Sequence, residues 1–243
     1  MATRKTKTAT PEPKREAPPQ TLEGHIFYGL SLSDEQIAFR NAIWDRNTDI
    51  VFCNANPGTG KTLVTMATGM LMYESGVING IVYMSAAGVY EHKQGLLPGT
   101  IEEKSRIFQI PLRQSLVRLG YDPDRVISSD AYMLAQKEGM ACITAQTDSY
   151  IRGINIGDDE THVLLVVDEA QNFTRQALRT VLTRVGSGSY AVVIGQARQC
   201  DLKYPQDSGF LPAIELFRDQ PWCKVCTLSQ SFRSRIAQKA DEL

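Results

Sequence analysis

The sequence has 243 residues, of which 42% are hydrophobic and 22% are charged, a composition typical of a globular protein with one large domain. The formal net charge is -1, which excludes a global positive field for nucleic acid, so any such contact must be a local patch. No apolar stretch approaches the roughly 18 residues of a spanning helix and the N-terminus lacks a secretory segment, so we expect a cytoplasmic protein with no membrane partner.

The first residues differ in composition from the rest of the chain. Residues 1–20 are rich in Thr, Lys, Arg and Pro and have no hydrophobic period, which predicts a disordered basic tail. Residues 21–243 are expected to form a single domain. Its first helix should begin near Ser33, because residues 33–36 (SDEQ) fit a capping box and the following apolar residues recur at helical spacing.

A glycine-rich stretch follows the apolar run 50–53 and precedes a helix expected over 63–73. Such a turn lets backbone N–H groups converge on phosphate oxygens, Lys61 adds a cation, and the Thr62 hydroxyl can bind Mg²⁺. One position departs from the usual pattern, since Ala55 stands where the first glycine is expected. The pattern predicts ATP bound with Mg²⁺. The residues expected to bind the nucleotide here are Asn56, Pro57, Gly58, Thr59, Gly60, Lys61 and Thr62.

Short apolar runs with turn signals between them predict further strands over 80–84, 142–144, 163–167, 191–194 and 224–228. Helices are expected between most of them, including 175–184, which Thr174 can cap, and a last helix from about residue 234. This alternation predicts an α/β fold with a mainly parallel sheet covered by helices on both faces. Residues 88–103 and 121–135 have no clear pattern.

Two carboxylates follow the apolar strand 163–167. Asp168 is expected to lie beside Mg²⁺, and Glu169 is expected to orient and deprotonate the attacking water. After the next strand, Gln199 is the candidate sensor of the γ-phosphate, although an ordinary polar turn also explains it. Arg233 follows the last strand and could reach the transferring phosphate in cis or from a neighbouring subunit. Arg184 and Arg198 are alternatives for that role. Arg233 could also be a surface arginine that binds no ligand.

Taken in order, several short strings resemble the PhoH family of P-loop ATPases. They are residues 58–62 (GTGKT), 95–99 (GLLPG), 103–104 (EK), 150–153 (YIRG), 168–172 (DEAQN), 182–186 (LTRVG) and 195–202 (GQARQCDL). The resemblance extends over about 32–240. It implies a P-loop NTPase fold like the motor domain of superfamily-one helicases, and an ATPase activity that in some members is linked to RNA.

The resemblance also implies roles for single residues. Gln36 would correspond to the glutamine that reads adenine in helicases, although a capping role explains it equally well. Residues 85–87 (SAA) replace the Thr-Arg-Pro string usual in the family, which removes an arginine contact to nucleic acid. Gln196 replaces an aspartate, so hydrolysis could be slower than in relatives. Because one core is present where a helicase has two, we expect a ring-like homo-oligomer such as a hexamer, with RNA or another single-stranded nucleic acid as partner.

Two other functions fit parts of the pattern. A nucleoside kinase of the thymidine kinase type also has an Asp-Glu-Ala-Gln string, but that family adds paired CxxC zinc ligands and a Phe directly after the Gln. Here Asn172 follows the Gln, and 223–226 is a lone CxxC. The second alternative is a nucleotide-dependent switch with weak or no hydrolysis, which residues 85–87 and Gln196 favour.

Overall fold

The structure is a computed structural model that describes residues 18–86, 108–128, 141–147 and 155–240. Six parallel strands form one sheet in the order β3-β2-β4-β5-β1-β6. Because the strands are parallel, each one is joined to the next along the chain by a crossover connection, as expected when helices cover both faces of a sheet. The strands are β1 Ile50–Ala55, β2 Gly80–Ser85, β3 Ile143–Thr147, β4 Val163–Asp168, β5 Tyr190–Gly195 and β6 Cys223–Leu228.

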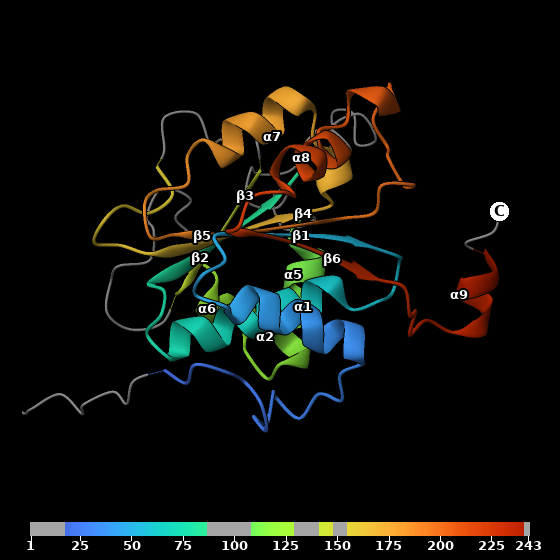
Figure 1. Ribbon diagram of the computed structural model, residues 1–243. Helices are drawn as coiled ribbons and strands as arrows, with labels where there is room; N and C mark the ends of the chain where they lie inside the picture. The colour runs from blue at the N-terminus through green and yellow to red at the C-terminus, as the bar shows by residue number, and fades with distance from the viewer. Residues whose placement is uncertain (1–17, 87–107, 129–140, 148–154, 241–243) are drawn as a thin grey trace, which may run out of the picture.

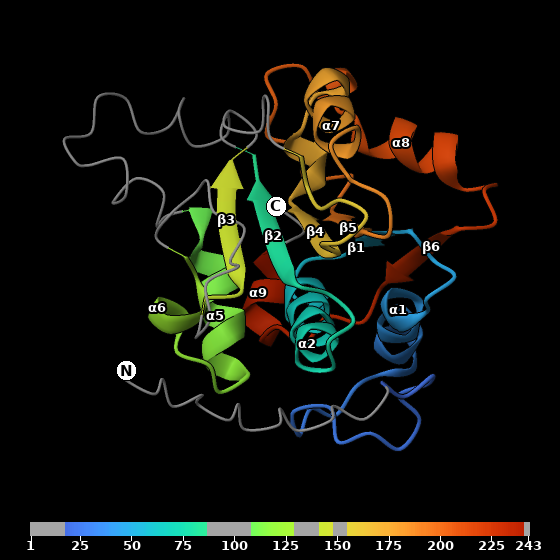
Figure 2. The ribbon, with the colours of Figure 1, turned by 90° about the vertical axis from the view of Figure 1, so that its left-hand side faces the viewer.

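Helices cover both faces of this sheet (Figure 1). One face is covered by α1 Asp34–Trp44, α2 Lys61–Glu74, α5 Ile110–Arg118 and α6 Pro123–Val126, and the other by α7 Arg175–Leu182 and α8 Phe210–Phe217. Figure 2 shows α5 and α6 beside β3. Shorter elements are the 3-10 turns η2 Ala170–Asn172 and η3 Pro205–Asp207, and the terminal helix α9 Arg235–Ala240, which has no buried residue. Within the described ranges, no helix is long and apolar enough to cross a bilayer.

Two hydrophobic cores lie on the two faces of the sheet. In β1, Val51 and Cys53 belong to the core under α1 and α2, whereas Ile50 and Phe52 belong to the core under α7 and α8. This split follows from the two-residue period of a strand. All residues of β2 and β4 are buried, as expected of central strands in a sheet covered on both sides. The sheet therefore forms a rigid platform for the groups at its edge.

Most predicted elements are present, with shifted ends. The capping box at Ser33 is formed, and Thr174 caps α7. The helix after the glycine-rich loop begins at Lys61, two residues earlier than predicted, with Gly60 as its N-cap. The helix predicted over 175–184 ends at Leu182. The sheet, predicted to be mainly parallel, is entirely parallel in its described strands.

Residues 1–17 of the predicted tail lie outside the described residues. Pro19, still within the range predicted to be disordered, accepts a hydrogen bond from the Trp44 indole at 3.1 Å. Leu22 and Phe27 are buried in the core under α1 and α2. The packed part of the chain therefore includes Leu22, and a contact to it comes from Pro19.

The parallel arrangement brings all strand ends of one kind to one edge. Ala55, Ser85, Asp168, Gly195 and Leu228 end β1, β2, β4, β5 and β6, so the segments that follow these strands meet at the carboxyl edge of the sheet. Ligands of open α/β sheets bind at this edge.

Candidate functional site

The glycine-rich loop, residues 56–60, connects β1 to α2 at the carboxyl edge. We call it the phosphate loop, after the binding role predicted for it. Gly58 and Gly60 have φ angles of 72° and 77°, in the left-handed region that favours glycine. The Thr59 hydroxyl donates to the carbonyl of Asn56 at 2.9 Å and closes the turn. Gly60 is the N-cap of the 14-residue helix α2, and no side chain caps the first amides of this helix. Those amides and the helix dipole are therefore available to an anion.

Thr62 and Asp168 meet at the head of α2. The Thr62 hydroxyl donates to Oδ2 of Asp168 at 2.9 Å, although the two residues lie 106 positions apart. The pair supplies a hydroxyl and a carboxylate, the oxygen ligands that Mg²⁺ prefers, and Mg²⁺ commonly needs only one or two carboxylates beside the phosphates. In the described part of the chain, no group of three or more His, Cys, Asp or Glu side chains could hold a metal alone. The residues therefore fit Mg²⁺ bound together with a nucleotide.

Tyr83 is a second donor to the same carboxylate oxygen. Its hydroxyl lies 2.7 Å from Oδ2 of Asp168, and its side chain in β2 is buried. The other oxygen, Oδ1, accepts from the backbone N–H of Glu169 at 2.8 Å. Burial and then the charge of Glu169 raise the pKa of Asp168, and the charge of Lys61 with the hydroxyls of Tyr83 and Thr62 opposes that rise. These hydrogen bonds fix both oxygens of Asp168 in one orientation.

Lys61 and Glu169 form an ion pair across the site. Nζ of Lys61 lies 3.5 Å from Oε1 of Glu169, and the side chains are 12% and 35% exposed. Glu169 itself has a left-handed backbone with φ 52°, one of two such non-glycine residues among those described. A strained backbone of this kind costs about 1–3 kcal/mol and persists where the surroundings enforce it. With this backbone conformation the Glu169 side chain, at the end of β4, reaches Lys61 at the end of the loop.

Gln171 connects Glu169 to the segment after β5. Its Nε2 donates to Oε2 of Glu169 at 2.6 Å and to the carbonyl of Gln199 at 3.1 Å. Its Oε1 accepts from the backbone N–H of Gln196 at 2.9 Å. Gln199, the predicted sensor, therefore meets this network through its carbonyl, and its side chain is exposed. Gln196 is buried beside Gln171.

Arg233 lies over the phosphate loop of its own chain. A Cβ built on Gly58 would stand 2.7 Å from Cδ and 2.9 Å from Nε of Arg233, so this arginine would have to shift if residue 58 had a side chain. The backbone N–H of Phe232 donates to the carbonyl of Gly58 at 2.9 Å. The ring of Phe232 is 55% exposed next to the loop. Of the three candidate arginines, Arg233 is the one whose side chain meets the loop.

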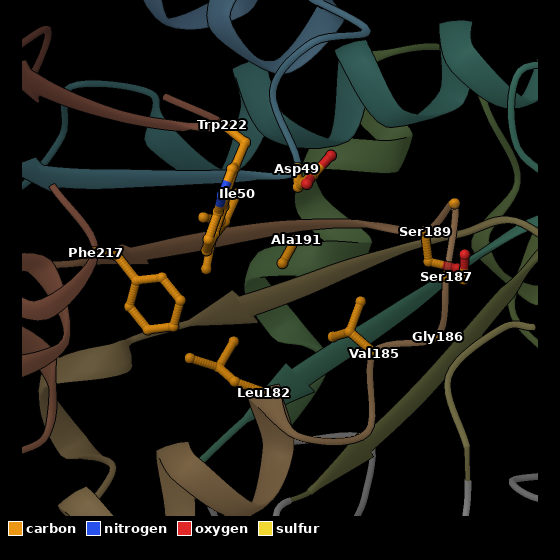
Figure 3. A pocket seen from close by; sticks show the side chains of 11 residues that line it. Asp49, Ile50, Leu182, Val185, Gly186, Ser187, Ser189, Ala191, Phe217 and Trp222 are labelled. Atoms are coloured by element: carbon orange, nitrogen blue, oxygen red, sulfur yellow. The ribbon is translucent and has the colours of Figure 1, made fainter. Parts of the chain in front are cut away.

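The other two arginines lie elsewhere. Arg198 is exposed after β5. Arg184 belongs to the 182–186 string, which borders a cavity of about 340 Å³ at the opposite edge of the sheet, where β1 and β5 begin (Figure 3). The cavity is lined by Asp49, Ile50, Leu182, Val185, Gly186, Ser187, Gly188, Ser189, Ala191, Phe217 and Trp222.

Gln36 lies beside the loop with both ends of its amide engaged. Nε2 donates to the carbonyl of Thr59 at 2.8 Å, and Oε1 accepts from the backbone N–H of Ser33 at 3.0 Å. Gln36 is buried. This arrangement matches the capping alternative and adds a contact that supports the loop. Asn56 and Pro57 lie in the turn as predicted, whereas the strings at 95–99, 103–104 and 150–153 lie outside the described residues.

Fold and site together define the class. A glycine-rich turn between a parallel strand and a helix, with Lys-Thr at the helix start and a buried aspartate facing the threonine, is the P-loop NTPase arrangement. The predicted fold class is therefore confirmed. The chain belongs to the family described as PhoH-like protein, whose sequence model matches residues 31–243, and this confirms the resemblance.

Curated relatives agree with this assignment. The chain is 34% identical over 189 residues to Protein PhoH2 of Bacillus subtilis (strain 168), and the alignment covers 76% of this chain and 41% of the relative. It is 32% identical over 175 residues to a PhoH-like protein of Mycobacterium bovis (strain ATCC BAA-935 / AF2122/97), covering 72% and 46%. The chain thus spans less than half the length of these relatives.

Among solved structures, the large terminase of bacteriophage HK97 aligns with 87% of this chain and 42% of its own, at 13% identity and a TM-score of 0.45. The SWI2/SNF2 ATPase core of Sulfolobus solfataricus, solved with double-stranded DNA, aligns with 88% and 47% at the same identity and TM-score.

Three residues of the site were not predicted from the sequence. Tyr83 has the pattern of an ordinary strand residue, and Glu35, described below, that of an ordinary acidic residue in a first helical turn. Gln171 is part of the 168–172 string but had no assigned role. A polar hydroxyl within the apolar run 80–84 is the one local signal that could have singled out Tyr83, because a buried hydroxyl needs a partner.

Changing Tyr83 to Phe tests its contact with Asp168. The substitution removes a hydrogen bond to a buried carboxylate, so we expect a loss of about 1–3 kcal/mol in the free energy of unfolding and a higher Mg²⁺ concentration for half-maximal nucleotide binding. Thermal unfolding and a Mg²⁺ titration measure the two effects. Tyr204→Phe is the matched control, because Tyr204 is 52% exposed. An unchanged Mg²⁺ requirement would show that Tyr83 does not orient Asp168.

Proposed function

We propose that this protein binds ATP with Mg²⁺ and hydrolyses it to ADP and phosphate, and that a single-stranded nucleic acid, RNA in the first place, stimulates the reaction. The observation that carries the ATPase proposal is the convergence of four side chains at one edge of the sheet: Lys61, Thr62, Asp168 and Glu169. They join a cation, a hydroxyl and two carboxylates at the head of one helix.

Each residue has a role in this proposal. The first amides of α2 and the Lys61 ammonium bind the phosphates, and Thr62 with Asp168 holds Mg²⁺, which when bound neutralises charge on the phosphate oxygens. Glu169 accepts a proton from the attacking water. Its ion pair with Lys61 at 3.5 Å keeps both side chains at the site until phosphates compete for the ammonium. Gln171 keeps Glu169 in place and links it to Gln199, through which we propose that loss of the γ-phosphate is sensed.

Arg233 is proposed to act in cis on the nucleotide of its own chain. Its side chain lies over Gly58, which supports an arginine that acts on the phosphates of its own subunit. The ring of Phe232, exposed next to the same loop, offers a flat apolar surface for a nucleobase. We also propose a ring-like homo-oligomer such as a hexamer, which an arginine that acts in cis does not require.

The nucleic-acid part of the proposal rests on the likeness of the PhoH family to helicase motor domains. Residues 85–87 (SAA) contain no arginine, whereas the family usually has one here, and Ser85 and Ala86 are buried at the end of β2. We therefore propose that RNA contact depends on other segments and modulates hydrolysis without a requirement for unwinding.

Phosphate release from ATP by the purified chain tests this function. We expect release that depends on Mg²⁺ and increases when single-stranded RNA is added, with a stimulation that falls as salt rises because phosphate contacts release counterions. Single-stranded DNA of the same length distinguishes the nucleic acids. Tight ATP binding with background release, with and without RNA, would support a nucleotide-dependent switch instead. Labelled phosphate transferred to a nucleoside would support a kinase.

A further inference from the structure

The first turn of α1 contacts the segment that follows β6. The carboxylate of Glu35 accepts three hydrogen bonds from it: Ser229 N–H to Oε2 at 2.7 Å, Ser229 Oγ to Oε1 at 2.5 Å, and Gln230 N–H to Oε2 at 3.3 Å. The hydrogen bond from the Ser229 hydroxyl, followed by those from the two amides, lowers the pKa of Glu35. Three donors therefore converge on a charged acceptor from 194 positions away along the chain.

This segment, residues 229–233, also contacts the phosphate loop, and we call it the cover segment. Directly before it, the N–H of Asn56 donates to the carbonyl of Leu228 at 2.9 Å, and within it the N–H of Phe232 donates to the carbonyl of Gly58 at 2.9 Å. Arg233 follows at once and lies over Gly58. Glu35 is thus a side-chain anchor, beside the Asn56 side-chain amide that donates to the Ser229 carbonyl at 3.5 Å, of a segment whose far end presents the arginine to the loop.

The neighbouring residue on α1 anchors the loop itself. Gln36 donates to the carbonyl of Thr59, and its own position is fixed by the capping box with Ser33. Two consecutive residues of one helical turn therefore hold the two partners, Glu35 the cover segment and Gln36 the loop. Because α1 packs on α2 and on β6, the turn is a fixed reference for both.

We propose that Glu35 is a positioning residue that holds the cover segment against α1 and so keeps Arg233 beside the phosphates of its own chain. The inference rests on the proposed function, because it assigns to Arg233 a contact with the γ-phosphate. The Glu35 carboxylate accepts from Ser229 and Gln230. Its effect on the γ-phosphate should therefore pass through Arg233, whereas an effect through Phe232 would act on ATP and ADP alike.

Backbone amide exchange in the nucleotide-free protein tests the anchor directly. In Glu35→Gln, one of the two acceptor oxygens becomes an NH₂ that faces the donors, so we expect the amides of Ser229, Gln230 and Phe232 to exchange about tenfold faster. Glu35→Asp keeps the charge but shortens the side chain, and should also speed exchange. Asp34→Asn is the matched control: it removes an acidic group from the same turn, where Asp34 is exposed. Unchanged exchange in Glu35→Gln would overturn the proposal.

The preference for ATP over ADP tests the link to Arg233. It is measured as a ratio of dissociation constants in a Glu169→Gln background, so that it does not depend on hydrolysis. We expect Arg233→Ala and Glu35→Gln each to lower the preference, the former about tenfold, and the double variant to be no worse than Arg233→Ala. Additive losses, or no loss in Arg233→Ala, would overturn the proposal. A wild-type protein that releases no phosphate would overturn the ATPase function while these two readouts still decide the role of Glu35.

Discussion

Glu169→Gln is expected to lower the rate of ATP hydrolysis by ~10²- to 10⁴-fold, the usual contribution of a general base, while ATP binding persists. The amide keeps the size of the side chain and one acceptor oxygen, but it cannot take a proton from water. The ion pair with Lys61 is lost at the same time, which leaves the ammonium free for phosphates. Nucleotide affinity should therefore stay the same or rise.

Single-turnover phosphate release measures the rate, and fluorescence titration with a labelled nucleotide measures the affinity. Glu215→Gln is a suitable control, because Glu215 is an exposed residue of α8 paired with Arg218 at 2.9 Å. If Glu169→Gln hydrolyses ATP at the wild-type rate, another group activates the water and the mechanism proposed here is wrong.

Lys61→Ala is expected to weaken ATP binding by about 10- to 100-fold, the effect of losing charge-assisted contacts to phosphate. The side chain is 12% exposed and its ammonium points towards Glu169 across the loop. Without it, Glu169 is left as an unpaired carboxylate facing the triphosphate, so repulsion adds to the loss. Calorimetric titration with MgATP measures the change.

Lys224→Ala provides the control for loss of a positive charge. Lys224 is exposed on β6, paired in register with Val51 near the beginning of β1, and so lies away from the loop. Equal affinity in Lys61→Ala and wild type would mean that nucleotide binds elsewhere. A Lys61→Ala protein that fails to bind should still unfold cooperatively, because the residue lies at the start of α2 and outside both cores.

Much of the fold was predictable because its signals are local. Each strand is a short apolar run, and the starts of α1 and α7 were predicted from capping residues. The helix α8 was missed. Pro212 lies in its first turn, where a missing N–H costs nothing, but in the sequence it interrupts the helical pattern.

The parts of the site that are contiguous in sequence were predictable, and the contacts between distant residues were not. The phosphate loop and the Asp168-Glu169 pair are each contiguous in sequence, so their residue types and spacing were sufficient. The supporting contacts are not contiguous: Tyr83 reaches Asp168 across 85 positions, and Glu35 reaches Ser229 across 194. No short pattern encodes such a pair, since it exists only once the order of strands brings β2 beside β4 and β6 beside α1.

The cavity lined by Trp222 and Phe217 has a practical meaning for ligand discovery. It opens where β1 begins, whereas phosphates are expected where β1 ends, and six residues of strand separate the two by roughly 20 Å. A small molecule bound in this cavity would not overlap the proposed nucleotide site. Any inhibition that it caused would therefore not be relieved by added ATP. A compound selected to fit this cavity would therefore occupy the edge of the sheet that has none of the proposed catalytic groups.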